Sequence, residues 1–129
     1  MRVTNPYTLE SVEVEETKDI QKVYERAARA FKDWSAHSVS ERVEILTKAL
    51  DKLTPRRHEL ARLISEEMGK PITAAGLEFD RALEECQHSL SNAREFLEPE
   101  RLPDAEIQFA PLGVVAVIAP WNFPLPGTS

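Results

Sequence analysis

Hydrophobic residues recur every three or four positions through most of residues 17–98, and this spacing predicts amphipathic helices. The first predicted helix runs from about Thr17 to Trp34, and either Thr17 or Asp19 is placed to cap it. Its apolar stripe consists of Ile20, Val23, Tyr24, Ala27, Ala28, Phe31 and Trp34. Ser38 and Glu41 have the spacing of a capping box and predict the start of a second helix. The apolar face of that helix carries Val39, Val43, Leu46, Leu50 and Leu53.

Residues typical of helix boundaries predict two more helices. Thr54 is expected to cap the third helix, and Pro55 suits its first position because a proline needs no N–H partner there. Gly69, with Pro71 two residues later, predicts a left-handed end to this helix. The fourth and longest helix is predicted over about residues 73–97. One side of it is apolar, with Phe79, Leu83, Cys86, Leu90, Ala93 and Leu97.

Extended structure is predicted at both ends of the chain. Residues 1–16 alternate weakly and indicate an extended arm, at most an edge strand or one arm of a hairpin. The unbroken apolar run from Val114 to Ala119 follows Gly113 and predicts a strand buried on both faces, as in the middle of a parallel sheet. The expected segments are an arm (1–16), a helical part (17–98), a linker with a half-exposed strand (99–111), and a buried strand with a Pro-Trp-Asn-Phe-Pro loop (112–129).

Charge and composition narrow the class of protein. The net charge of −6 and the isoelectric point near 5.1 argue against a nucleic-acid partner, which would need a basic surface. The single cysteine, Cys86, fits a reducing compartment. The first residues lack the apolar core of a signal peptide, and no apolar run approaches the about 20 residues of a membrane span. We therefore expect a cytoplasmic protein without a membrane partner.

Several candidate sites have simpler explanations. Cys86 falls on the apolar side of the fourth predicted helix, so core packing is favoured over a nucleophilic role. His37, His58 and His88 have no metal-ligand spacing, and no metal site is predicted. The sequence Gly69-Lys70-Pro71 lacks the rest of a phosphate-binding loop and is interpreted as the end of a helix.

Asn122 is the strongest candidate for chemistry. Taken alone, an asparagine here would simply cap a turn. It follows the predicted buried strand, however, and ligands of open α/β sheets bind beyond the carboxyl ends of strands. Pro120 and Pro124 stiffen the loop around it, and Trp121 and Phe123 flank it. A side-chain amide held in this position can donate a hydrogen bond to a developing oxyanion.

The segment from Pro111 to Pro124 resembles the signature at the start of the cofactor domain of NAD(P)-dependent aldehyde dehydrogenases. The same family order and spacing are found upstream, in the segments 5–8 (Asn-Pro-Tyr-Thr), 27–34, 41–46 and 66–71 (Glu-Glu-Met-Gly-Lys-Pro). The resemblance implies an α/β, Rossmann-like fold. This segment would supply its mostly helical part, with an N-terminal arm, four amphipathic helices and one or two C-terminal strands.

The resemblance also implies a site and a reaction. Asn122 matches the oxyanion-hole asparagine, and the positions that line the cofactor site are Ile118, Ala119, Pro120 and Trp121. The family oxidises an aldehyde to the acid with NAD or NADP, through a thiohemiacetal on a cysteine, and a homo-oligomer is expected. The aldehyde remains open between a semialdehyde and a short aliphatic aldehyde, and the choice between NAD and NADP remains open as well.

Differences between this sequence and the family pattern limit the activity expected of the isolated chain. The nucleophilic cysteine, the general-base glutamate and the main cofactor-binding elements of the family lie downstream of Asn122, and Cys86 does not match the nucleophile. We therefore expect the 129-residue chain to be inactive and to bind no cofactor specifically. Leu9 stands where the family often has a glycine turn, and residues 126–129 are poor helix sequence where the family continues into a helix.

An alternative is that the four helices form their own core and serve as a non-enzymatic assembly or interaction module. Cooperative unfolding of a defined monomer or oligomer would favour this alternative. The apolar run from Val114 to Ala119 would then have to be paired or covered, because an unpaired apolar strand promotes aggregation.

Overall fold

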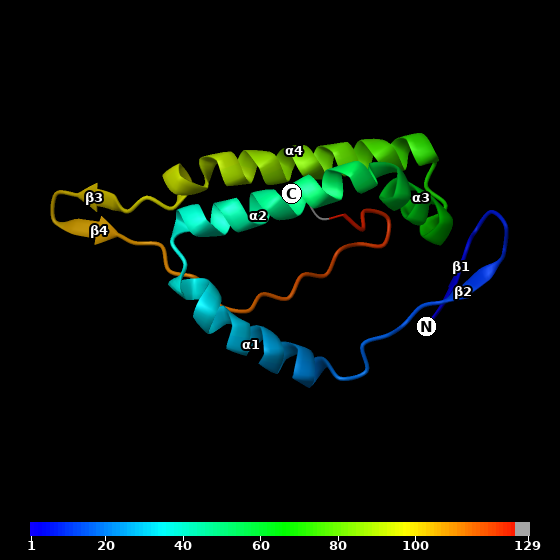
Figure 1. Ribbon diagram of the computed structural model, residues 1–129, viewed down its shortest axis with the longest axis horizontal. Helices are drawn as coiled ribbons and strands as arrows, with labels where there is room; N and C mark the ends of the chain where they lie inside the picture. Colours follow the sequence, from blue (N-terminus) through cyan, green and yellow to red (C-terminus); the bar gives the residue numbers. More distant parts are fainter. Residues whose placement is uncertain (126–129) are drawn as a thin grey trace.

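A computed structural model describes residues 1–125 of the chain (Figure 1). The described elements, in order, are β1 (Arg2–Thr4), β2 (Ser11–Glu13), α1 (Ile20–Ala36), α2 (Val39–Leu53), the 3₁₀-helix η1 (Thr54–Arg56), α3 (Arg57–Met68), α4 (Ile72–Phe96), β3 (Glu100–Leu102) and β4 (Ala105–Ile107). In Figure 1, α4 lies beside α2, with α3 towards its N-terminal end, and α1 diverges from this group. The predicted poor helix sequence at 126–129 lies outside the described residues.

The helix boundaries follow from local hydrogen bonding. Asp19 caps α1 by accepting a hydrogen bond from the backbone N–H of Lys22 at 3.0 Å. The predicted capping box of α2 is present, because the Ser38 hydroxyl accepts from the Glu41 N–H at 3.2 Å and the Glu41 carboxylate accepts from the Ser38 N–H at 2.7 Å. Gly69 ends α3 with a φ of 77° and donates its N–H to the Ser65 carbonyl.

The predicted cap at Thr54 is wrong. The Thr54 hydroxyl donates to the Leu50 carbonyl at 2.9 Å, one turn back, instead of accepting from the turn ahead. The chain continues from α2 through η1 into α3 without an extended residue, and an N-cap needs such a residue. Pro55 lies in η1, where its missing N–H breaks no helical bond.

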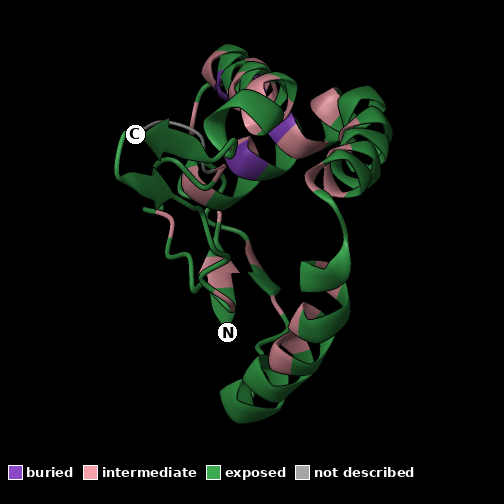
Figure 2. Cartoon of the chain, turned by 90° about the vertical axis from the view of Figure 1, so that its left-hand side faces the viewer, coloured by how far each residue is buried: buried purple, intermediate pink, exposed green. Residues whose placement is uncertain are grey.

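Burial is confined to the contact between α3 and α4 (Figure 2). The buried hydrophobic residues in the described part of the chain are Ala61, Ile64, Ala75 and Phe79. Ala61, Ile64 and Ala75 form one cluster, and Met68 and Leu125 pack against it. Much of the remaining apolar surface is exposed, so the helices by themselves form only a small core. This gives little support to a free-standing helical module.

Cys86 is exposed, which corrects the expectation that it packs in the core. The neighbouring Gln87 and Leu90 line a groove with Val43 and Leu50 of α2, so α2 faces that side of α4. The side chains of consecutive residues in an α-helix point about 100° apart. Cys86 therefore lies at the edge of the surface of α4 that faces α2. Phe79, Leu83, Leu90 and Ala93 of the predicted apolar side are buried or half-buried, so that side is largely covered, and Cys86 is an exposed exception.

The predicted buried strand at Val114–Ala119 is also wrong for the described part of the chain. This segment forms no strand, and Val117 and Ile118 are 71% and 94% exposed. A central strand needs hydrogen-bonded neighbours on both sides and layers on both faces. Residues 1–125 pair strands only within the two hairpins, so nothing in them satisfies this apolar run.

The two hairpins account for the other extended segments. β1 and β2 are antiparallel with Val3 opposite Val12, so the segment predicted as at most one strand or hairpin arm is a complete hairpin. β3 and β4 are also antiparallel, and their turn is formed by Pro103 and Asp104. The half-exposed strand expected within residues 99–111 is replaced by this hairpin, whose second strand ends at Ile107 because the turn sets the pairing register. None of the helices described in residues 1–125 is both long and apolar enough to span a membrane.

Candidate functional site

The predicted site residue Asn122 lies in a turn near the end of the described chain. The Phe123 N–H donates to the Pro120 carbonyl at 3.0 Å, which places Trp121 and Asn122 at the two central positions of the turn. The Asn122 side chain is exposed, and it makes no hydrogen bond to another of residues 1–125. Within the described part of the chain, no acceptor occupies its amide N–H₂.

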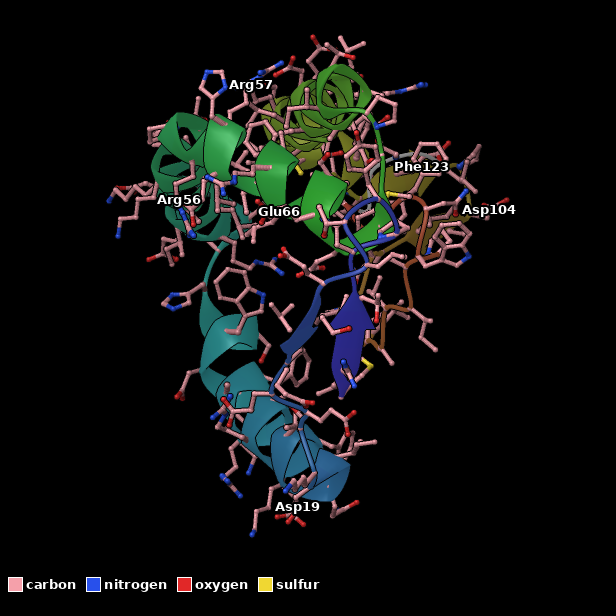
Figure 3. All side chains as sticks on the ribbon, turned by 90° about the vertical axis from the view of Figure 1, so that its right-hand side faces the viewer. Asp19, Arg56, Arg57, Glu66, Asp104 and Phe123 are labelled. Atoms are coloured by element: carbon pink, nitrogen blue, oxygen red, sulfur yellow. The ribbon has the colours of Figure 1, made fainter. Side chains whose placement is uncertain are left out.

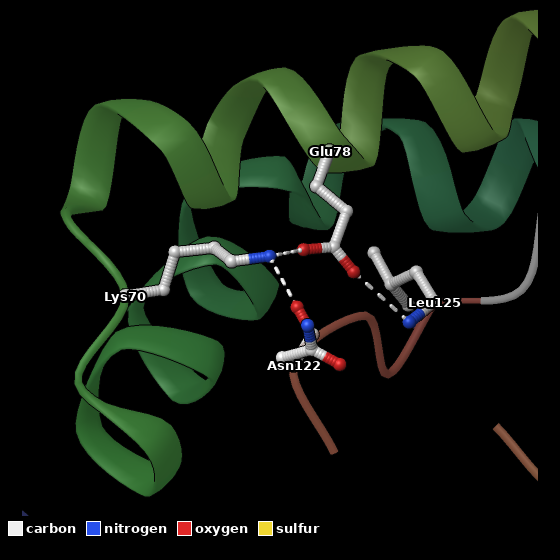
Figure 4. A network of polar contacts seen from close by, with 4 residues as sticks. All are labelled: Lys70, Glu78, Asn122 and Leu125. Atoms are coloured by element: carbon white, nitrogen blue, oxygen red, sulfur yellow. Dashed lines mark hydrogen bonds and ion pairs between the residues drawn. The ribbon is translucent and has the colours of Figure 1, made fainter. Parts of the chain in front are cut away.

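The backbone of this loop is held by Lys70 and Glu78 (Figure 4). The Lys70 ammonium forms an ion pair with the Glu78 carboxylate and donates a hydrogen bond of 2.7 Å to the backbone carbonyl of Asn122. The other Glu78 oxygen, Oε1, accepts from the Leu125 N–H at 3.1 Å. The two charged side chains are only 12% and 4% exposed. One buried ion pair thus holds the loop at two points.

Aromatic and apolar contacts reinforce this attachment. Lys70 Nζ lies 4.1 Å from the centroid of the Phe123 ring, within the range of a cation–π interaction. Leu125 packs on the cluster formed by α3 and α4. Figure 3 shows Phe123 beside these helices and far from Asp19 at the start of α1.

Local sequence explains why Lys70 points to this place. Gly69 turns the chain at the end of α3, and Pro71 precedes the first turn of α4. Lys70 therefore stands between two helices instead of on the face of one. Glu78 lies less than two turns into α4, on the side that also buries Ala75 and Phe79.

The sequence matches the model of the aldehyde dehydrogenase family over residues 1–127. The chain belongs to the aldehyde dehydrogenase family. It is 38% identical over 128 residues to a succinate-semialdehyde dehydrogenase [NADP(+)] of Deinococcus radiodurans, covering 94% of this chain and 27% of that protein. It is 36% identical to a malonate-semialdehyde dehydrogenase of Bacillus cereus, covering 95% of this chain and 27% of the relative.

A solved structure is similar over nearly the whole chain. Glyceraldehyde-3-phosphate dehydrogenase GapN from Methanocaldococcus jannaschii, complexed with NADP, aligns with a TM-score of 0.87 and 25% identity. The match covers 97% of this chain and 29% of that one. The chain thus spans little more than a quarter of the length of these relatives. The predicted family and α/β fold class are confirmed, with this segment as the mostly helical part.

The positions predicted to line the cofactor site occupy one continuous stretch of the chain. Ile118 and Trp121 are 94% and 77% exposed, Pro120 is exposed and Ala119 is half-buried. Their apolar surface suits the flat, uncharged parts of a dinucleotide. Neither charged side chains nor a helix N-terminus occur in this stretch to hold its phosphates. These residues therefore offer an apolar surface and no group that would hold a phosphate.

Lys70 and Glu78 are the two residues that the sequence interpretation missed. Helix termination accounted for Gly69 and Pro71 in the Gly-Lys-Pro turn and left Lys70 unexplained. The second available signal was Glu78, a charged residue next to Phe79 on a face of α4 that is otherwise buried. Residues 1–125 contain no cluster of three or more histidine, cysteine or acidic side chains that could hold a metal.

Proposed function

We propose that the chain is the N-terminal segment of an enzyme that oxidises an aldehyde to the carboxylic acid with NAD or NADP. The observation that carries the proposal is the exposed amide of Asn122 on a loop whose backbone is held by a buried ion pair. A donor held in place before the reaction stabilises developing charge without reorganising during the reaction.

The proposed role of Asn122 is to stabilise an oxyanion. When a thiolate attacks an aldehyde carbonyl, the carbonyl oxygen gains negative charge, and the Asn122 amide N–H₂ would donate a hydrogen bond to it. Ile118, Ala119, Pro120 and Trp121 would form an apolar wall against the cofactor, which when bound accepts a hydride from the substrate carbon. The exposed amide and these four side chains lie on adjacent residues, which supports a shared site.

Asn122 supplies only part of the catalytic machinery. The one cysteine, Cys86, lies in α4 and has no match to the family nucleophile, so the 129-residue chain is proposed to be inactive alone. The purified chain should produce no NADH or NADPH from any aldehyde. Turnover that persists through ion exchange, with a single species in the intact mass spectrum, would contradict this statement.

The role of Asn122 is tested in the full-length enzyme. Replacing Asn122 with Ala is expected to lower kcat by about 10²–10³, as for the loss of one oxyanion-hole donor. Asn92→Ala is the matched control, because the Asn92 amide bonds to the His88 carbonyl within α4 and away from the loop. Unchanged kcat in the Asn122 variant would overturn the proposed role.

The proposed substrate class is a short semialdehyde. Support comes from the names of the two relatives above, which act on succinate semialdehyde and malonate semialdehyde. The test compares kcat/KM for succinate semialdehyde with that for butanal, which has the same four-carbon chain but no carboxylate. A preference for butanal would contradict the proposal and favour a short aliphatic aldehyde. Separate titrations with NAD and NADP decide between the cofactors.

We also propose a homo-oligomer in the cytoplasm. The exposed apolar run around Val117 and Ile118 supports an additional buried contact, within the longer protein or between copies. The single cysteine supports a reducing compartment. Sedimentation of the full-length enzyme over a concentration series tests the oligomer.

A further inference from the structure

The Lys70–Glu78 ion pair is unusually well enclosed for this small segment. Its side chains are 12% and 4% exposed, whereas the other side-chain ion pairs in residues 1–125 have partners that are 36% exposed or more. Removing two charges from water is unfavourable unless their pairing and further hydrogen bonds compensate for it. The other groups that bond to a buried ion pair therefore show which part of the protein the pair holds in place.

Within residues 1–125, the further partners of the two charged side chains belong to the loop that carries Asn122. Lys70 Nζ donates to the Asn122 carbonyl and lies over the Phe123 ring, and Glu78 Oε1 accepts from the Leu125 N–H. The ammonium has three N–H donors, and its three contacts are Glu78, the Asn122 carbonyl and the Phe123 ring. Little donor capacity is left to contact a substrate directly.

We propose that Lys70 and Glu78 are positioning residues that hold the Asn122 amide in the geometry needed to meet the oxyanion. The catalytic part of this inference rests on the proposed function of Asn122. The backbone is fixed at the Asn122 carbonyl and at the Leu125 N–H, and the turn hydrogen bond from Phe123 to Pro120 closes the loop on the other side. With the backbone held, only the two side-chain torsions of Asn122 remain to be set.

The Arg57–Asp80 pair provides a matched control. Arg57 also pairs with an acid of α4, through two hydrogen bonds of 2.6 Å, but its side chain is 36% exposed, and no hydrogen bond or ion pair within residues 1–125 joins either residue to the loop. Figure 3 shows Arg57 and Phe123 well apart. Breaking this second pair removes an ion pair of α4 without touching the Asn122 loop.

The first experiment measures loop attachment in the 129-residue chain by amide hydrogen exchange. Lys70→Met is expected to raise the exchange rate of the Leu125 N–H at least about tenfold more than Arg57→Met does, after correction for global stability in urea. Lys70→Arg retains a donor for Glu78 and the Asn122 carbonyl and is expected to restore most of the protection. Equal exchange in Lys70→Met and Arg57→Met would overturn the proposal.

A second variant guards against failure to fold. Lys70→Met leaves the Glu78 carboxylate buried without its counter-ion, so Lys70→Met combined with Glu78→Gln removes both charges together. The side-chain amide oxygen that Glu78→Gln introduces can still accept from the Leu125 N–H, whereas the Asn122 carbonyl loses its donor. Loss of protection at the Phe123 N–H, with the Leu125 N–H still protected, is expected, and unchanged protection at Phe123 would contradict the proposal.

The second experiment uses the full-length enzyme and a double-mutant cycle. Lys70→Met is expected to lower kcat at least about tenfold with little change in the KM for the cofactor, and Arg57→Met is expected to leave both unchanged. In an Asn122→Ala background, Lys70→Met should have almost no further effect on kcat, because its effect passes through Asn122. Full additivity would overturn the positioning role. If Asn122→Ala alone is harmless, the proposed function fails, whereas the exchange experiment still tests the attachment of the loop.

Discussion

The ring of Pro6 fills the space where a side chain at Gly69 would lie. A Cβ at Gly69 would stand 2.5 Å from Cγ of Pro6, closer than two carbon atoms can approach without contact strain. Gly69 also has a φ of 77°, in the left-handed region that favours glycine. Because Gly69 has no side chain, the turn of the N-terminal hairpin can pack directly against the end of α3, close to Lys70.

Replacing Gly69 with Ala is expected to destabilise the chain by about 1–3 kcal/mol, from backbone strain and the clash with Pro6 together. Gly113→Ala is the control, because Gly113 also has a positive φ of 94° but a Cβ there meets nothing within 4 Å. Urea unfolding followed by circular dichroism measures both variants. Equal losses at the two positions would show that the contact with Pro6 contributes nothing.

At Leu9, in contrast to Gly69, a substitution is expected to stabilise the chain. It has a φ of 62°, its N–H donates to the Asn5 carbonyl at 2.9 Å, and its side chain is 75% exposed. Leu9→Asn should stabilise the chain by up to about 1 kcal/mol, because asparagine tolerates the left-handed conformation better and little apolar contact is lost. Leu77→Asn, at an exposed position inside α4, should instead destabilise it. A lower urea midpoint for Leu9→Asn would contradict this prediction.

The capping box predicts a cost at Ser38. Ser38→Ala removes the acceptor of the Glu41 N–H and should cost about 1 kcal/mol of unfolding free energy. Ser89→Ala, in the exposed interior of α4, serves as the control and should be neutral or slightly stabilising. A similar urea midpoint for the two variants would argue against the box.

The Arg57–Asp80 pair predicts a loss of stability in acid. The hydrogen bonds from Arg57 lower the pKa of the Asp80 carboxyl below its usual value. A carboxyl with a lowered folded-state pKa contributes its full stabilisation above its unfolded pKa, about 4, and loses it as the pH falls further. Urea midpoints of the wild type should therefore fall more steeply below about pH 4 than those of Asp80→Asn. Parallel curves would refute the contribution of Asp80.

Much of the helical part was predictable because its signals are local. The apolar stripes, the Ser38–Glu41 box and the left-handed Gly69 each depend on residues within one or two turns. The predicted helices accordingly match α1 to α4 closely. Thr54 is the exception, since its hydroxyl had a competing acceptor one turn back.

Residue types alone identified the family and singled out Asn122, because the order of short motifs is carried by the chain itself. Tertiary structure decided what holds Asn122, since Lys70 and Glu78 reach its loop only after α3 and α4 have packed. It also decided that Cys86 is exposed, because burial depends on which neighbour covers a face as well as on the apolar pattern of that face. The run at Val114–Ala119 shows the same division: its side chains favour burial, and only partner strands can provide it.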